Sequence, residues 1–284
     1  TFGQSGQLNH ALGYHGSASY AINNVSGDSV RKIAVYPSSS VSHAGKIVLA
    51  GDGNESGKTQ YVTTVIRLNA DGRSLDTSFN GTGKQTIDFG ASGPDFCRGV
   101  LIQPDDKIVV LTEHRTTASP YSQVGLARIN ANGTMDTTFN GNGVYMTYVG
   151  GYGIYPYAIA RQKNGAYVIA GNDSGYNACV VRIAPNASSA NIYRAGMRSA
   201  LGYTGDYEHF WGVCLDDAPS GSQAIYAVGT VQTSFGGKYR ATVAKLDSAG
   251  DYQWKKAFDY DVAGSRGSDV LCWDFGGAIG EKIV

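Results

Sequence analysis

Apolar residues along this chain fall into short stretches that alternate with polar positions and are separated by clusters of glycine, asparagine and aspartate. The clearest pair of stretches flanks Pro104-Asp105-Asp106. Proline fixes φ and aspartate stabilises a tight turn, so this pair predicts a β-hairpin. Asparagine and glycine at 130–133 predict a turn into a further, outer strand. The strands predicted for this part of the chain are 99–103, 107–111, 124–129 and 144–149.

The same order of strands and turns recurs along the whole chain. Segment 67–90 returns as 128–150, 98–113 returns as 157–172, and looser copies occur at 31–52, 211–230 and 269–284. Equivalent positions in the first strand of each unit are spaced 54 to 67 residues apart, at Ile33, Val100, Ile159, Val213 and Val270. Repeated units of four antiparallel strands, with no helical period between them, predict an all-β protein with the β-propeller fold.

The repeat spacing predicts a single domain, residues 1–284, with five blades. The expected blades are approximately 29–92, 96–151, 155–206, 208–264, and 268–284 completed by 1–17. An N-terminal strand near 8–14 would then supply the piece that the last blade lacks, which closes the ring and removes free sheet edges. The alternative, that the chain is a piece of a longer repeat array, stays open.

Composition narrows the class of protein. The chain has 39 Gly and 19 Tyr, only 16% charged residues, and 23 basic against 23 acidic side chains. This balance provides no basic patch for nucleic acid or a membrane surface, and no apolar stretch is long enough to insert into a bilayer. A turn-rich β protein that begins with Thr1 instead of Met is typical of a mature secreted product or an excised domain.

Four cysteines, at 97, 179, 214 and 272, lack the spacing of a zinc site. We expect them to be buried free thiols within strands, and the sequence leaves any disulfide pairing open.

Part of the chain resembles the delta-60 repeat of bacterial surface proteins. The resemblance is carried by L-D-T-S-F-N-G-T-G at 75–83, the ending at 88–90, the hairpin at 103–109, and the next copy of the signature at 135–143. It weakens over 184–202 and 248–258. We expect Phe79 and Phe139, with Leu75 and Met135, to pack under the edge of a sheet. The resemblance implies a secreted or cell-envelope location and a propeller fold, and it brings no catalytic residues.

In a propeller, the connections that enter the first strand and leave the second strand of each blade share one face. Here these connections vary in length and carry aromatic, acidic and basic side chains. Aromatic rings can contact the apolar face of a sugar while planar polar groups bind its hydroxyls. The alternative for any single tyrosine is packing within a sheet. The candidate ligand-binding residues are Asp95, Arg98, His114, Arg115, Tyr121, Tyr155, Tyr157, Tyr176, His209, Trp211, Phe235 and Asp269.

The chain contains none of the common nucleophile, zinc-protease or phosphate-loop motifs. We therefore expect a non-catalytic recognition or adhesion module of a secreted or cell-surface bacterial protein, which binds a glycan, a surface polymer or a surface protein and forms part of a larger fibre or multidomain protein. One alternative is a glycan hydrolase or lyase that uses carboxylates at the mouth of the channel, drawn from Asp95, Asp206, Asp261 and Asp269. Another is a structural or protein-interaction propeller.

We expect no cofactor and no resident metal, with calcium as the one cation left open. Asp71, Gly72 and Asp76 are similar to an acidic calcium loop, but Asn132 replaces Asp71 in the next copy.

Overall fold

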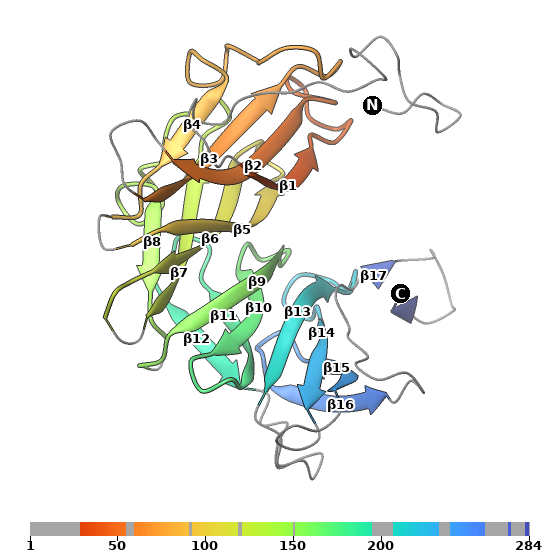
Figure 1. Cartoon of the computed structure of the whole chain (residues 1–284). Coiled ribbons are helices and arrows are strands. Elements are labelled where there is room, and N and C mark those ends of the chain that lie inside the picture. The colour runs from red at the N-terminus through yellow and green to blue at the C-terminus, as the bar shows by residue number, and fades with distance from the viewer. Residues whose placement is uncertain are drawn as a thin grey trace. The chain divides into compact units, whose positions relative to one another are not determined.

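The computed structural model describes residues 29–54, 60–90, 93–118, 121–149, 151–194, 207–232, 239–258, 272–273 and 282–283. Its elements are all β-strands, and four of its sheets have four antiparallel strands each (Figure 1). These sheets confirm the predicted fold class, an all-β protein built from four-stranded antiparallel blades. Within the described ranges, no helix is long and apolar enough to cross a membrane.

The chain divides into two compact units. Unit 1 comprises Thr1–Thr117 and Gly125–Met146, and it holds two sheets except for the first residues of β7 and the last of β8. The first sheet has the order β1 (Ser29–Val35), β2 (Ile47–Asn54), β3 (Tyr61–Leu68) and β4 (Lys84–Ile87). The second has the order β5 (Asp95–Ile102), β6 (Ile108–Arg115), β7 (Ser122–Ile129) and β8 (Val144–Thr147).

Unit 2 comprises Ala118–Val124 and Thr147–Val284. One sheet consists of β9 (Ile154–Arg161), β10 (Tyr167–Asp173), β11 (Ala178–Ile183) and β12 (Ala190–Arg194). The next consists of β13 (Glu208–Leu215), β14 (Ile225–Gln232), β15 (Tyr239–Leu246) and β16 (Tyr252–Phe258). A two-stranded sheet pairs β17 (Cys272–Trp273) with β18 (Lys282–Ile283).

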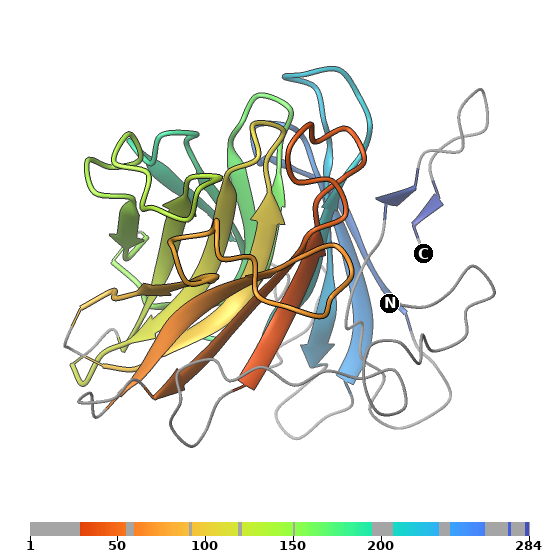
Figure 2. The same ribbon diagram turned by 90° about the horizontal axis from the view of Figure 1, so that it is seen from above.

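The cores lie between neighbouring sheets of the same unit. The strands of each sheet lie side by side in both views (Figures 1 and 2), and the second strands β6, β10 and β14 are almost fully buried. In unit 1, Val48, Phe79 and Val110 belong to one buried cluster. In unit 2, Val168, Phe210 and Ala227 belong to another. Strands covered on both faces read as continuous apolar runs, which is why the repeat was visible in the sequence.

The strands predicted for 99–149 are all present, but the first two are longer than predicted. The hairpin β5–β6 extends from Asp95 to Arg115, beyond the predicted 99–103 and 107–111. Asp95, Arg98, His114 and Arg115 therefore lie on paired strands, where the sequence placed them in connections. The polar side chains at these strand ends hydrogen-bond one another, so the alternation of apolar and polar residues that predicts a strand is absent there. The five-blade count and the single closed domain stay predictions, since the closing segment 1–17 lies outside the described residues.

The cysteines behave differently from one another. Cys97 and Cys179 are buried free thiols, as predicted, and burial raises the pKa of Cys97 to about 12. Cys214 is disulfide-bonded, so the expectation of a free thiol is wrong at that position.

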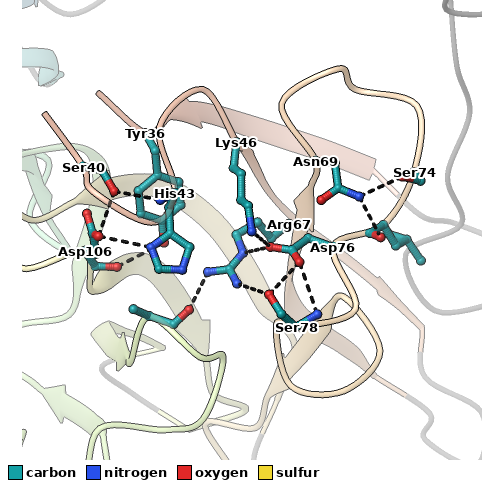
Figure 3. Close-up of polar contacts among 12 residues, drawn as sticks. Tyr36, Ser40, His43, Lys46, Arg67, Asn69, Ser74, Asp76, Ser78 and Asp106 are labelled. Carbon is teal, nitrogen blue, oxygen red and sulfur yellow. Dashed lines mark hydrogen bonds and ion pairs between the residues drawn. The ribbon is translucent and has the colours of Figure 1, made fainter. Parts of the chain in front are cut away.

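The signature segment of unit 1 is built around one buried guanidinium (Figure 3). Arg67 is 0% exposed, donates from Nε to Asp76 Oδ2 at 2.7 Å, and lies 4.7 Å from the ring centroid of Phe79. Lys46 Nζ is also 2.7 Å from Asp76 Oδ2. Asp76, which the sequence compared with a calcium loop, is thus the counterion of two cations.

The next sheet repeats this network. Arg128 Nε donates to Asp136 Oδ2 at 2.6 Å, Lys107 Nζ lies 3.0 Å from the same oxygen, and the guanidinium is 4.7 Å from the ring centroid of Phe139. Phe79 and Phe139 are both fully buried, which confirms the predicted packing of the signature phenylalanines. The repeated signature therefore builds the same buried structural network in both sheets of unit 1, and loss of one partner would leave an uncompensated buried charge.

Candidate functional site

The first strand of every four-stranded sheet carries a β-bulge at the same position. The pairing of β1 with β2 skips one residue between Val30 and Lys32, and the same irregularity recurs in β5, β9 and β13. A bulge leaves one residue unpaired and re-aims its side chain. The four bulge residues are Arg31, Arg98, Tyr157 and Trp211.

Glycine opposite the bulge allows the two backbones to approach. Gly229 pairs with Phe210, and a Cβ added at Gly229 would lie 1.7 Å from the carbonyl oxygen of His209. At Gly171, the equivalent Cβ would lie 2.3 Å from the carbonyl oxygen of Tyr155. Gly51 occupies this place in β2, while Thr112 occupies it in β6. The bulge therefore occurs opposite Thr112 as well as opposite glycine, and in unit 2 the backbones approach too closely for a Cβ at Gly171 or Gly229.

On the second strand of all four sheets, the residue that follows the one opposite the bulge is polar and buried. Its side chain hydrogen-bonds a side chain of a first strand. The bonded pairs are Asp52 Oδ1 with Arg31 Nε at 3.0 Å, Glu113 Oε2 with Arg98 Nε at 2.9 Å, Asn172 Oδ1 with His209 Nδ1 at 2.8 Å, and Thr230 Oγ1 with Trp211 Nε1 at 3.3 Å. Each sheet thus presents one bulge side chain and one buried polar residue that orients a side chain beside it. We call the bulge residues, the buried polar residues and the side chains that bond or stack against them the bulge face of each unit.

The bulge face of unit 1 is charged. Glu113 is 1% exposed and holds two guanidiniums, with Arg98 on Oε2 and Arg115 Nε on Oε1 at 2.6 Å. The ring of Phe96 lies beneath both, 4.6 Å from the Arg115 guanidinium carbon and 5.8 Å from that of Arg98. Buried acids thus orient partly exposed arginines, an arrangement that suits planar anions.

The bulge face of unit 2 is aromatic. The rings of Tyr157 and Trp211 have centroids 4.4 Å apart, and His209 stacks on Trp211 at 5.0 Å with an interplanar angle of 25°. All three side chains are partly exposed. Because His209 Nδ1 donates to the Asn172 amide oxygen, Nε2 of the neutral ring is an acceptor. Of the predicted group of Tyr155, Tyr157, His209 and Trp211, the last three have rings in contact in the structure.

Two predicted residues form a buried pair instead of an open surface. His114 Nδ1 lies 2.7 Å from Asp95 Oδ1, and both residues are almost completely buried. Burial raises the pKa of Asp95, against the lowering effect of His114. The pair joins the ends of β5 and β6 and so positions the neighbouring residues Phe96 and Glu113.

Three of the five remaining predicted residues lie within the described ranges. Tyr155 is partly buried on β9, beside Asn172 in the register. Tyr121 and Tyr176 are exposed at positive φ, and Tyr176 makes an edge contact with Tyr207 at 4.8 Å. Phe235 and Asp269, like the proposed catalytic carboxylates Asp206 and Asp261, lie outside the described residues. Ligand binding by these residues stays a prediction.

Sequence reasoning missed Arg31 and the buried polar residues behind the bulges. A signal was present: two apolar residues, a small residue and a polar residue recur as Leu49 to Asp52, Val110 to Glu113, Ile169 to Asn172 and Ala227 to Thr230. A polar residue at a constant place in a buried strand marks a fixed hydrogen bond. In the described residues, no group of three or more His, Cys, Asp or Glu side chains is placed to hold a metal ion.

Comparison with known proteins supports the fold. Residues 45–79 and 103–139 match a family model described as "Domain of unknown function (DUF5122) beta-propeller". No curated protein matches the chain. The matched segments contain the Arg67–Asp76 signature and the β6–β7 region, the same repeats that the sequence singled out.

Three solved structures illustrate the similarity. A Bifidobacterium bifidum s17 protein described as an exo-beta-1,3-galactanase is 13% identical, with a TM-score of 0.42 over 82% of this chain and 74% of its own. The intramolecular trans-sialidase of Ruminococcus gnavus is 9% identical, with a TM-score of 0.41 over 71% of this chain and 41% of its own. The endo-arabinase of Bacteroides thetaiotaomicron VPI-5482 is 10% identical, with a TM-score of 0.35 over 78% and 74%. We draw nothing about function from similarity this remote.

Proposed function

We propose that this protein is a glycan-recognition module in which the aromatic bulge face of unit 2 is the sugar-stacking platform. The observation that carries the proposal is the group of Tyr157, His209 and Trp211, three partly exposed rings on neighbouring first strands. Aromatic faces bind the apolar face of a pyranose, and rings with few rotatable bonds lose little entropy on binding.

Polar groups around the rings suit the hydroxyls of a sugar. Asn172 and Thr230 fix the orientation of His209 and Trp211 before a ligand arrives, so binding does not have to immobilise these side chains. This combination of apolar contact and fixed polar groups is typical of small-ligand sites.

The proposal includes binding without turnover and action outside a bacterial cell. The disulfide of Cys214 favours an oxidising compartment, in agreement with the resemblance to repeats of bacterial surface proteins. The one predicted catalytic carboxylate that the structure describes, Asp95, is enclosed with His114, which supports a positioning role.

A glycan array tests the proposal with two tryptophan variants. Wild type, Trp211→Ala and Trp254→Ala are screened on bacterial envelope polysaccharides and peptidoglycan fragments. Trp254 is the matched control, because it is 38% exposed and lies on β16, at the opposite edge of the sheet from β13. We expect discrete hits that weaken at least about tenfold in Trp211→Ala and persist in Trp254→Ala.

A blank array for wild type, or equal binding by Trp211→Ala, would contradict the proposal. Release of reducing ends from the bound glycan would contradict its non-catalytic part and favour a hydrolase.

A further inference from the structure

The bulge face of unit 1 holds more cationic than anionic groups. Arg31, Arg98 and Arg115 surround two carboxylates, Asp52 and Glu113. Both carboxylates are at most 1% exposed, whereas the side chains of Arg31 and Arg115 are 44% and 48% exposed. The acidic charge is therefore enclosed, and the guanidiniums face solvent.

The three arginines belong to one continuous network. Asp52 Oδ1 accepts from Arg31 Nε at 3.0 Å and from the backbone N–H of Cys97 at 3.1 Å, and Cys97 directly precedes Arg98. Glu113 then joins Arg98 to Arg115. This chain of bonds fixes the three guanidiniums relative to one another within unit 1.

Donors remain on this network for a ligand. Among the described residues, the side chain of Arg115 hydrogen-bonds only through Nε, to Glu113, so neither Nη1 nor Nη2 of Arg115 has a bonded partner there. Its guanidinium is held over the ring of Phe96 at 4.6 Å. A planar fork of donors that is already oriented, stacked and partly exposed matches the geometry of a carboxylate or sulfate group.

We propose that unit 1 carries an anion subsite, with Arg115 as its main contact and Arg98 and Arg31 beside it, that binds the acidic group of a charged glycan. This inference rests on the proposed function, because it specifies the ligand class of the same recognition module. A carboxylate on a uronic acid and a sulfate ester share the required chemistry.

The test is isothermal titration calorimetry with four probes. Hexagalacturonate and its methyl ester share one sugar backbone and differ in charge. A heparin hexasaccharide adds sulfate to its uronate carboxylates, and hexaglutamate supplies carboxylates without sugar. The variants are Arg115→Gln, Arg115→Lys and Arg73→Gln. Arg73 is an exposed residue of unit 1, so its loss removes the same charge away from the network.

We expect an acidic glycan to bind at least about tenfold more tightly than the methyl ester, and Arg115→Gln to remove that advantage. Arg115→Lys keeps the charge but lacks the fork, so it should recover only part of the affinity. Arg73→Gln should bind within about twofold of wild type. Because heparin carries uronate carboxylates as well as sulfates, a sulfate contact predicts tighter binding of heparin than of hexagalacturonate.

Two results would overturn the inference alone: equal binding of the acid and the methyl ester, or an equal loss of affinity in Arg115→Gln and Arg73→Gln. Glycan recognition would then still stand on the Trp211 array result. Hexaglutamate that binds as tightly as hexagalacturonate would overturn the glycan assignment, since an acidic peptide would then satisfy the subsite. Thermal unfolding of each variant verifies that it is folded.

Discussion

The two units of this protein share the same β-bulge but present different side chains on it, charged in unit 1 and aromatic in unit 2. In unit 1 the bulge residues are Arg31 and Arg98, held by buried Asp52 and Glu113. In unit 2 they are Tyr157 and Trp211, with Asn172 and Thr230 behind the rings. The bulge and the buried polar position stay constant, so the exposed side chains can change from charged to aromatic without a change in the strand pairing.

A second difference between the units lies near the C-terminal end of the third strands. A cation occupies the same register position in three sheets, as Arg67, Arg182 and Lys245. In unit 1, Arg67 has a carboxylate partner, Asp76. In unit 2, Arg182 donates to the amide of Gln162 and Lys245 lies over the ring of Tyr226. The Arg67–Asp76 pair and its repeat, Arg128–Asp136, both lie in unit 1.

The largest expected effect comes from breaking this ion pair. Asp76→Asn leaves Arg67 buried with a neutral partner, and loss of one member of a buried pair costs about 3–5 kcal/mol. The free energy of unfolding, measured by urea titration, should fall by this amount. Asp71→Asn, at an exposed turn position, is the charge-matched control and should change it by less than about 0.5 kcal/mol. A similar loss in both variants would show that Arg67 does not depend on Asp76.

Acid should remove the same contribution in unit 1. Burial raises the pKa of Asp76 and Asp136, but hydrogen bonds from Lys46 and Ser78 to Asp76, and from Thr138 and Lys107 to Asp136, outweigh burial and hold both pKa values well below the usual range. A depressed pKa stabilises the fold above about pH 4, the unfolded value, and this stability is lost as the pH falls further.

Hydrogen exchange followed by mass spectrometry at pH 3 and pH 7, corrected for the intrinsic rates, measures this difference. Protection should fall more in β3 and β7 than in β11 and β15. Equal loss of protection in the two units would contradict the comparison.

The bulge itself can be broken in unit 2. Gly229→Ala places a Cβ against the carbonyl oxygen of His209, and relief of this overlap requires the strands to separate. Overpacking of this kind costs about 1–3 kcal/mol, and it should also disturb the stacking of His209 on Trp211. Thr112→Ala serves as the comparison, because β6 already has a side chain at this position. A fully stable Gly229→Ala protein with unchanged ligand binding would contradict the assigned role of this glycine.

The smallest effect should come from the polar support behind Trp211. Thr230→Val keeps the shape but removes the acceptor of the indole N–H, a bond of 3.3 Å. Such a loss costs about 0.5–1.5 kcal/mol in the free energy of unfolding. Glycan affinity should fall by roughly threefold, because the ring becomes less fixed. An unchanged affinity would show that the ring is held by Tyr157 and His209 alone.

The sequence predicted the repeat, the four-stranded sheets and the burial of Phe79 and Phe139, because apolar runs and turn residues act locally. It also grouped Tyr155 with Tyr157, His209 and Trp211, because these residues occupy similar places in successive repeats, and the rings of the last three are in contact. It could not show that Asp95 and His114 bond each other, because their pairing depends on the length of the β5–β6 hairpin. The bulge was equally invisible, since it depends on how two backbones approach.

The most direct test of the central claim follows the indole N–H of Trp211 by nitrogen-15 NMR during titration with the strongest hit of the glycan array. Trp211→Phe assigns its resonance, and the resonance of Trp254 is the internal reference. The account predicts that the Trp211 resonance shifts and saturates with the glycan while that of Trp254 stays in place. A Trp211 resonance that does not move while the glycan binds would show that the aromatic bulge face is not the binding site.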